Sequence, residues 1–232
     1  MSRCTTDGAV GAAPGCRLPI MAVVMNANQP STRSRTPWNM DKLVGPKAPF
    51  KPKDVWTMRM HLQQHHRTRE LALLNLGIDS KLRGCDLVAL KARDIAHGEQ
   101  IAPRAIIQQR KTGRPVQFEI TPVTRQAVQE WIRQAGLGPD DYLFPSCLHG
   151  SPHVGTRQYA RMLRRWVKDA GLDWTEYGTH SIRRTKATLI YRRTKNLRAV
   201  QLPLGHSRVE STVRYLGIDV DDALEISEQT EI

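Results

Sequence analysis

The sequence predicts an α+β fold that is mainly helical and contains one small antiparallel β-hairpin. Two patterns lead to this prediction: apolar residues recur at helical spacing in most segments after residue 51, and two short β-type runs flank a turn with Gly and Pro. In addition, 40% of the 232 residues are hydrophobic, which is enough to bury a core. We therefore expect one folded domain over residues 51–218.

Two terminal segments fall outside this domain. Residues 1–50 are rich in Gly, Ala, Pro, Ser and Thr with little periodicity, so we expect them to be disordered. Residues 219–232 contain six acidic residues and no basic one. This acidic tail is expected to dock on a basic surface of a neighbouring protomer; the alternative is a frayed, soluble chain end.

The first two helices are predicted from capping residues and apolar spacing. Asp54 is expected to cap a helix whose apolar residues include Trp56 and Leu62. Thr68 is expected to cap a second, leucine-rich helix that ends at Gly77. Both helices are predicted to belong to the core.

The middle of the chain predicts the hairpin and a third helix. Residues 105–109 and 116–120 are β-type runs, and the segment 111–115 between them contains Gly and Pro. Pro122 then opens a helix that ends before Gly136 and carries Val128 and Trp131 on one side.

A helix with two distinct faces is predicted over residues 156–170. Its apolar residues follow the i, i+3, i+4, i+7, i+8 spacing of one buried face. Cations line the other face, where like charges destabilise a helix, so we expect an anionic partner; the alternative is a solvated face. This cationic face consists of Arg157, Arg161, Arg164, Arg165 and Lys168.

The overall charge also indicates an anionic partner. The chain has 35 Lys and Arg against 22 Asp and Glu, which gives a net charge of +13. Such a balance favours an extended polyanion such as DNA, although a basic surface without a specific role is the alternative. The apolar run at residues 18–25 is too short to span a bilayer, so no membrane segment is predicted.

Neither the cysteines nor the histidines predict a metal site. The four cysteines lack paired spacing, which argues against a disulfide framework and fits a reducing cytosol. His61 and His65 share one helix face, and Cys147, His149 and His153 lie close in sequence, but neither group supplies a convincing ligand set. We expect no metal and no cofactor.

Four separated pieces of the sequence carry residues suited to chemistry on a phosphate. They are Leu82–Leu87 with Arg83 and Asp86, Arg110–Gly113 with Lys111, Thr179–Arg183 with His180, and Leu204–His206 followed by Thr212–Leu216 with Tyr215. In their order and spacing they resemble the tyrosine recombinase, or phage integrase, family over about residues 52–223. The resemblance implies the mainly helical catalytic domain of that family, with its small β-hairpin.

The resemblance also implies a role for each matching residue. Arg83 and Arg183 hold oxygens of the scissile phosphate, because planar guanidinium groups stay protonated and stabilise the charge of the transition state. His206 adds a further donor. Tyr215 is the nucleophile, and since a phenol has a pKa near ~10, it needs a base and a positive field. His180 is the candidate base.

Lys111 at the hairpin tip is expected to protonate the departing 5′ oxygen. The product is a 3′-phosphotyrosyl linkage that a second 5′ hydroxyl can attack without ATP. The same hairpin and the cationic helix are expected to contact DNA. The predicted DNA-binding residues are Arg110, Thr112, Arg114, Arg157, Arg161, Arg164 and Arg165.

Each matching residue also has a purely structural explanation. Arg83 can cover a helix start, Lys111 can be an ordinary turn residue, and His180 can bond a helix N-terminus. His206 follows a glycine that ends a helix, and Tyr215 can be a core aromatic. All of these residues occur together in one order, which favours the catalytic interpretation.

The chain departs from the family pattern in three ways. Arg184 stands where the family often has His, and Pro203 stands where a helical Leu is common. Pro203 lacks an amide hydrogen, so we expect it to remove one helical bond near His206. About fifty residues precede Pro52, which leaves no room for the helical domain of typical members and resembles short recombinases with only a catalytic domain.

Together these features predict a site-specific recombinase that binds double-stranded DNA as a tetramer, with accessory DNA-bending proteins, at the nucleoid in a bacterial cytoplasm. Two alternatives remain open. One is a catalytically inactive DNA-binding protein that regulates recombination sites. The other is a topoisomerase-like enzyme that relaxes DNA with the same tyrosine chemistry.

Overall fold

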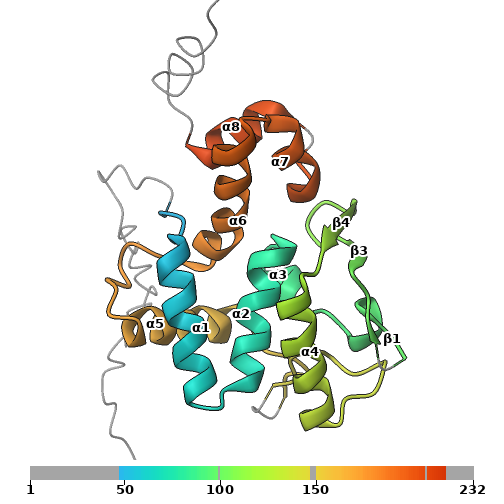
Figure 1. Cartoon of the computed structure of the whole chain (residues 1–232). Helices are drawn as coiled ribbons and strands as arrows, with labels where there is room; N and C mark the ends of the chain where they lie inside the picture. Colours follow the sequence, from blue (N-terminus) through green and yellow to red (C-terminus); the bar gives the residue numbers. More distant parts are fainter. Residues whose placement is uncertain (1–46, 99, 147–149, 207, 218–232) are drawn as a thin grey trace, which may run out of the picture. The chain divides into compact units, whose positions relative to one another are not determined.

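The computed structural model describes residues 47–98, 100–146, 150–206 and 208–217 (Figure 1). The helices are α1 (Pro52–Gln64), α2 (Thr68–Ser80), α3 (Gly84–Leu87), the 3-10 helix η1 (Ala92–Asp94), α4 (Pro122–Ala135), α5 (Thr156–Asp169), α6 (Thr179–Thr194), α7 (Leu197–Leu204) and α8 (Val209–Leu216). The strands are β1 (Ala96–His97), β2 (Gln100–Ile101), β3 (Arg104–Gln108) and β4 (Pro115–Glu119). The predicted α+β fold, mainly helical, is confirmed.

Both terminal predictions fall largely outside the described residues. Of the segment 1–50 only residues 47–50 are described, and the acidic tail 219–232 lies beyond the last described residue. Phe50 is buried, with 2% of its surface exposed. Its ring stacks on Tyr177 with centroids 4.4 Å apart, and its amide donates to Thr185 Oγ1 at 3.0 Å. Packing against the helices is therefore already established at Phe50.

The predicted hairpin is confirmed as β3 and β4. The strands pair antiparallel, with Arg104 opposite Glu119 and Gln108 opposite Pro115. Val116 and Phe118 on alternate positions of β4 are buried, as expected for a strand with one face on the core. A second small sheet, β1 paired with β2, was not predicted.

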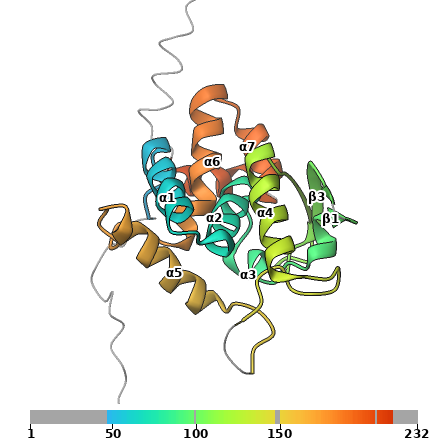
Figure 2. The same ribbon diagram turned by 60° about the horizontal axis from the view of Figure 1, so that its bottom comes forward.

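Helix α2 lies between α1 and α4 in both views of the fold (Figures 1 and 2). It continues three residues past the predicted end at Gly77, to Ser80, and Lys81 closes it in the left-handed conformation with φ 54°. Position 77 requires a glycine, because side chains from three other elements approach its backbone closely. A Cβ there would lie 3.1 Å from Ile182 and from Leu87, and 3.2 Å from the Tyr159 hydroxyl.

Helix α1 differs from the prediction in its capping residue and its buried face. Asp54 lies inside the first turn, where its side chain accepts a hydrogen bond from the Lys51 amide at 3.1 Å. Trp56 was predicted in the core but is 63% exposed. The buried apolar residues are Val55, Met58 and Leu62, whose spacing places them on one side of the helix.

Helices α4 and α5 follow their predicted patterns closely. The bounds of α4 are those predicted, and α5 ends one residue earlier than predicted, at Asp169. The apolar face of α5 is buried as expected, and it consists of Tyr159, Met162, Leu163, Trp166 and Val167. Since α5 packs against α1, α3 and α6, this face belongs to the large core.

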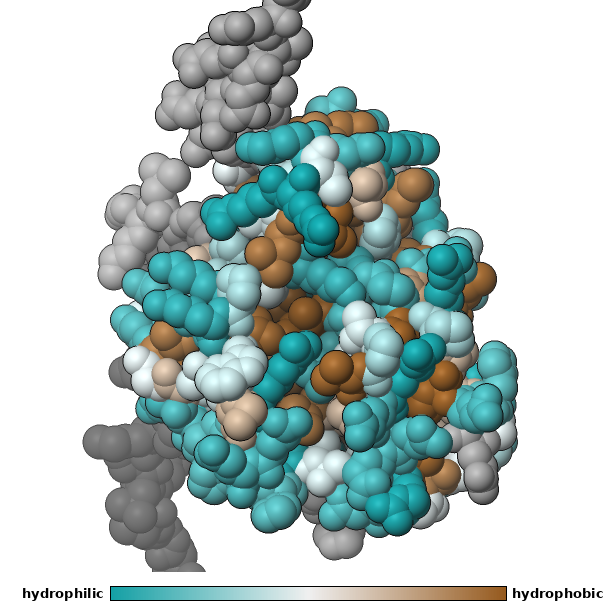
Figure 3. Space-filling model, viewed as in Figure 1, coloured by the Kyte–Doolittle hydropathy of each residue, from teal (hydrophilic) through white to brown (hydrophobic). Residues whose placement is uncertain are grey.

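A second, smaller hydrophobic cluster lies among α6, α7 and α8. It consists of Ala187, Tyr191, Val200, Leu204 and Leu216. Helix α6 belongs to both clusters, because Ile182 near its start is part of the large core and Ala187 is part of the small one. The face of the molecule in Figure 3 is mostly hydrophilic, with hydrophobic side chains in separate patches. Among the described residues, no helix has the length and apolar character needed to cross a bilayer.

Candidate active site

Gln109 connects Arg83 to two other parts of the site. Arg83 lies between α2 and α3, and its Nη1 donates to Gln109 Oε1 at 2.5 Å. The same oxygen accepts from Thr112 Oγ1 at 2.8 Å, and Gln109 Nε2 donates to the Leu204 carbonyl at 3.4 Å. With only 1% of its surface exposed, Gln109 links Arg83 to the hairpin turn and to the end of α7.

Asp86, the acidic residue that follows Arg83, fixes the start of the hairpin turn. Its buried Oδ1 accepts the Arg110 amide at 2.9 Å. The carboxylate therefore bonds a backbone donor of the hairpin, and this contact aligns α3 with the turn that carries Lys111.

Arg183 is buried beside the predicted nucleophile. Its side chain is 3% exposed, and one Nη donates to the Leu204 carbonyl at 2.7 Å. Its Cζ lies 5.6 Å from the centre of the Tyr215 ring. Burial lowers the pKa of Arg183, but a guanidinium remains charged at neutral pH. Its buried Nε has no hydrogen-bond partner among the described residues.

His206 follows Gly205, which ends α7 in the left-handed conformation with φ 67°. Its Nδ1 lies 3.1 Å from Thr212 Oγ1, and its ring meets the Tyr215 ring edge to face, with centroids 5.3 Å apart. Burial, together with Arg183 and Arg83, lowers the pKa of His206 to about 4. The imidazole is therefore neutral at pH 7, and when Thr212 donates to Nδ1 it leaves Nε2 as the donor.

Pro203 is accommodated inside α7. The backbone near it is held by two hydrogen bonds, from the Gly205 amide to Leu202 at 3.0 Å and from the His206 amide to Gln201 at 3.3 Å. The expected loss of one helical donor therefore leaves His206 anchored through its own amide and in contact with Tyr215.

Tyr215 lies on α8 with its hydroxyl buried and without a hydrogen-bond partner among the described residues. Burial raises its pKa to about 12, although the positive charges of Arg183, Arg184 and Arg83 act in the opposite direction. The phenol is thus protonated at neutral pH, and its ionisation needs both a base and a stronger positive field.

Arg184, which the sequence marked as a departure from the family pattern, contacts the same tyrosine. Its Cζ lies 5.4 Å from the centre of the Tyr215 ring, and its Nη1 donates to the Lys47 carbonyl at 2.8 Å. Two consecutive guanidinium groups on α6 therefore face one aromatic ring.

His180 and Lys111 lie at the exposed side of this cluster. His180 is one turn before Arg183 on α6, which places both on the same side of the helix. Partial loss of hydration, followed by the charges of Arg183, Arg184, Arg83 and Lys111, lowers the pKa of His180. The structure does not join His180 to the Tyr215 hydroxyl, which has no bonded partner within the described part of the chain.

The predicted DNA-binding residues fall into two groups. Arg110, Thr112 and Arg114 lie in the exposed hairpin turn, next to the site. The other four are exposed on α5, which packs on the large core.

Two arginines of α5 already have partners within the protein. Arg164 stacks on Trp174 with its Cζ 4.8 Å from the ring centre, and Arg165 pairs with Glu70 at 2.7 Å. Arg157 and Arg161 are exposed on the same helix. The prediction that α5 contacts an anion therefore has the most support at Arg157 and Arg161.

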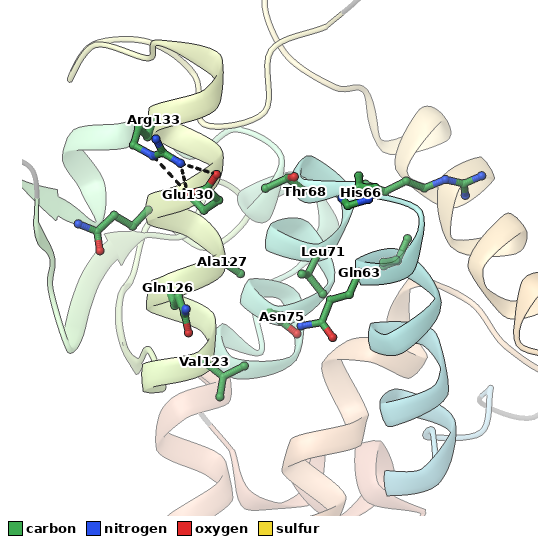
Figure 4. Close-up of a pocket in the computed structure, with 13 residues that line it drawn as sticks. Gln63, His66, Thr68, Leu71, Asn75, Val123, Gln126, Ala127, Glu130 and Arg133 are labelled. Atoms are coloured by element: carbon green, nitrogen blue, oxygen red, sulfur yellow. Dashed lines mark hydrogen bonds and ion pairs between the residues drawn. The ribbon is translucent and has the colours of Figure 1, made fainter.

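A groove of about 530 Å³ between the end of α1, α2 and α4 lies apart from this cluster (Figure 4). Leu71, Val123 and Ala127 line it together with polar side chains, including the ion pair of Glu130 and Arg133. None of the predicted catalytic residues lines this groove. Although the groove is large, it therefore has no part in the candidate chemistry.

Three residues that contact the site were not identified as site residues from the sequence. Gln109 and Thr212 are buried polar residues bonded to Arg83 and His206, and Arg184 covers Tyr215. A local signal exists for Gln109, which comes directly before the basic hairpin turn, and for Arg184, which follows Arg183. For Thr212 the sequence offers only its position one turn before Tyr215.

Comparison with known proteins gives a consistent result. The phage integrase family matches residues 51–221. The probable integrase/recombinase YoeC of Bacillus subtilis is 31% identical over 153 residues, which cover 66% of this chain and 80% of YoeC. Tyrosine recombinase XerC of Erythrobacter litoralis is 30% identical over 154 residues, but the match covers 47% of that protein. The chain thus spans about half the length of such XerC relatives.

Solved structures share the same fold. The XerA recombinase superimposes with a TM-score of 0.65 at 22% identity, covering 84% of this chain and 69% of XerA. The XerH recombinase bound to its difH substrate gives 0.63 at 19% identity, covering 80% of this chain and 55% of XerH. A lambda integrase dimer bound to a core site gives 0.57 at 16% identity, covering 78% and 50%.

Proposed function

Since the chain belongs to the phage integrase family, we propose that it is a site-specific DNA recombinase that acts through a 3′-phosphotyrosyl intermediate. The observation that carries the proposal is the environment of Tyr215, whose ring contacts His206 and two buried guanidinium groups. A purely structural tyrosine has no need for such a concentration of positive charge, because burying guanidinium groups is costly unless they meet an anion.

In the proposed reaction, Arg83 and Arg183 bind the non-bridging oxygens of the scissile phosphate. Arg83 is oriented by Gln109 and Arg183 by the Leu204 carbonyl, so both are held before DNA arrives. Preorganised donors of this kind stabilise the extra charge of a five-coordinate phosphorus. The neutral His206 adds a hydrogen bond through Nε2.

His180 accepts the phenol proton, and the Tyr215 oxygen attacks phosphorus while the bond to the 5′ oxygen breaks. The lowered pKa of His180 keeps it neutral at pH 7 and therefore able to accept. Lys111 supplies a proton to the departing oxygen. The 5′ hydroxyl of a partner strand then attacks the phosphotyrosine, the P–O bond to Tyr215 breaks, and the tyrosine regains its proton. No metal or cofactor enters these steps.

The partners follow from the same proposal. Residues 51–218 form the catalytic domain on double-stranded DNA, with the hairpin turn near the cleaved phosphate and the exposed side of α5 along the duplex. Four protomers assemble on two DNA sites, and the acidic tail 219–232 docks on a neighbour. Accessory DNA-bending proteins assist at the nucleoid of a bacterial cytoplasm.

A DNA substrate with a nick near the cleavage site tests the chemistry. The short fragment that carries the new 5′ hydroxyl diffuses away after cleavage, so the covalent intermediate cannot be resealed and accumulates. We expect wild-type protein to form a covalent complex and Tyr215→Phe to form none. Tyr142→Phe serves as the control and should react normally, because Tyr142 pairs with Lys91 and is not one of the proposed catalytic residues. Binding without any covalent complex would support an inactive DNA-binding regulator. Relaxation of plasmids without exchange between two sites would support a topoisomerase.

The contact of α5 with DNA is tested separately by the salt dependence of binding. Arg161→Ala should lower affinity uniformly across sequences and reduce the slope of log affinity against log salt by about 1. Arg165→Ala should change the slope less, because Glu70 already neutralises that side chain. Equal salt-dependence slopes for wild type, Arg161→Ala and Arg165→Ala would show that α5 is not part of the proposed interface.

A further inference from the structure

We infer that Arg184 is a positioning residue for the nucleophile, and that its guanidinium acts on Tyr215 whereas Arg83 and Arg183 act on the phosphate. The inference rests on the proposed function. It starts from a position where this chain departs from the family pattern, and where the guanidinium is buried with 4% of the residue exposed.

The first argument is the placement of the Arg184 side chain. Its Cζ lies 5.4 Å from the centre of the Tyr215 ring, within the range of a cation–π contact. Its Nη1 is held at 2.8 Å by the Lys47 carbonyl, in the segment that leads into α1. A backbone acceptor thus orients the charge toward the ring.

The second argument is that Arg184 also reaches the end of the helix that carries Tyr215. A Cβ built on Gly217, directly after α8, would lie 3.5 Å from Arg184 Nη2. The C-terminal end of a helix carries partial negative charge, so a cation there stabilises the helix. Arg184 therefore faces the Tyr215 ring and lies close to the C-terminal end of its helix.

The third argument separates Arg184 from its neighbour Arg183. In the proposed reaction the phosphate neutralises the charges of Arg83 and Arg183, which weakens their effect on the phenol when DNA binds. Arg184 has its Nη1 on a backbone carbonyl and its face on the ring, so its charge remains available to Tyr215. Burial raises the pKa of this phenol to about 12, and a persistent cation opposes that rise.

Burial of Arg184 is also difficult to explain by stability alone. Its Nε is buried with no partner among the described residues. An incompletely bonded buried charge stabilises a fold poorly, and an apolar residue of similar volume often does as well or better. A role in the reaction accounts for this cost.

The test measures single-turnover cleavage of the nicked substrate against pH, DNA affinity, and thermal stability for wild type, Arg184→Gln and Arg184→Lys. We expect roughly tenfold slower cleavage for Arg184→Gln, partial recovery for Arg184→Lys, and DNA affinity within about twofold of wild type. The rise of the cleavage rate with pH should move to higher pH in Arg184→Gln, because the Arg184 charge lowers the pKa of the base His180 as well as that of the phenol.

A substrate with a neutral methylphosphonate at the cleaved position separates the two arginines. Removing the phosphate charge lessens the need for a cation on its oxygens, so it should restore much of the cleavage lost in Arg183→Ala. The neutral substrate should not restore the cleavage lost in Arg184→Gln. The inference is overturned if the neutral substrate rescues Arg184→Gln, if that variant cleaves like wild type, or if its slower cleavage shows the wild-type pH dependence.

Ionisation of Tyr215 can be followed without any DNA. The alkaline absorbance change of each protein is compared with the same protein carrying Tyr215→Phe, so that the difference reports Tyr215 alone. Arg184→Gln should raise the pKa of that phenol, and Arg184→Lys should raise it less. An unchanged pKa would overturn the inference. If wild type fails to cleave while this shift is observed, the proposed function fails and the contact of Arg184 with Tyr215 stands.

Discussion

The two hydrophobic clusters of the described chain differ in size and in what they support. The large core joins α1 to α5, the hairpin and the start of α6, and it holds Arg83 and the turn with Lys111. The small cluster of α6, α7 and α8 holds His206 and packs against Tyr215. Arg83 and Lys111 are thus positioned by the large core, whereas His206 and Tyr215 are positioned by the small cluster.

The contacts between these regions explain why the site forms there. Gln109 and Arg183 both donate to the Leu204 carbonyl, and α6 continues from one core into the other. At this junction Arg183 and Arg184 are buried, and the Nε of each has no hydrogen-bond partner among the described residues. The comparison teaches that the larger region fixes Arg83 and the hairpin turn, whereas the smaller one carries His206 and the tyrosine.

The largest expected effect removes a donor of the large core. Arg83→Ala should slow cleavage by about 10²–10³-fold, since one preorganised donor to the transition state is lost. The melting temperature should change little, because Arg83 is only partly buried. Arg93→Ala, an exposed arginine of η1 paired with Asp140, is the control. The measurement is single-turnover cleavage. Similar slowing in both variants would show that the loss of any positive charge has this effect.

The next prediction disturbs the contact between the regions. Gly205→Ala should slow cleavage by up to about 10²-fold, because its Cβ would lie 2.6 Å from Val116 Cγ2 and shift the neighbouring His206. The positive φ adds about 1–3 kcal/mol of strain. Gly136→Ala has a similar φ of 61° but nothing within 4 Å, so it should be destabilised without slower cleavage. Equal rates for the two variants would contradict the importance of this contact.

A smaller effect is expected from the bridging side chain. Gln109→Leu keeps the side-chain volume but removes the hydrogen bond to Arg83. Since that bond involves a charged group, we expect cleavage to be about tenfold slower. Gln117→Leu makes the same change at an exposed position of β4 and should leave cleavage unchanged. The difference between the two cleavage rates measures how strongly Gln109 supports Arg83. Equal rates would mean that Arg83 is oriented by other contacts.

The smallest effect on cleavage is expected for a network inside the large core. Asp79 accepts from Thr121, Thr124 and Lys186, and these bonds lower its pKa although burial alone would raise it. Its contribution to stability is therefore complete above pH of about 4 and is lost as the pH falls through the lowered pKa. Asp79→Asn should reduce stability at pH 7 by about 3 kcal/mol and flatten the acid side of the stability profile.

Chemical denaturation at several pH values measures this effect. Cleavage at pH 7, by contrast, should change least among these variants, because Asp79 lies at the end of α2 and contacts none of the proposed catalytic side chains through the hydrogen bonds described. A large loss of cleavage in a folded Asp79→Asn protein would show that the two regions are coupled through Lys186 on α6.

Local sequence patterns determined most of the elements and the candidate site. The apolar spacing of α5 and the residues that open and close α4 act within one or two turns of chain, so their bounds could be predicted. The hairpin followed from its turn residues. The order of the motifs identified the six candidate catalytic residues, because the chemistry requires particular side chains at separated positions.

The tertiary structure alone decided which side chains meet across the chain. Trp56 carries an apolar side chain yet is exposed, and Phe50 is buried outside the predicted domain, because burial depends on what packs opposite. The contacts of Gln109 with Leu204 and of Arg184 with Lys47 join residues 95 and 137 positions apart. No local pattern encodes such pairs, since they form only when two separately patterned regions pack together.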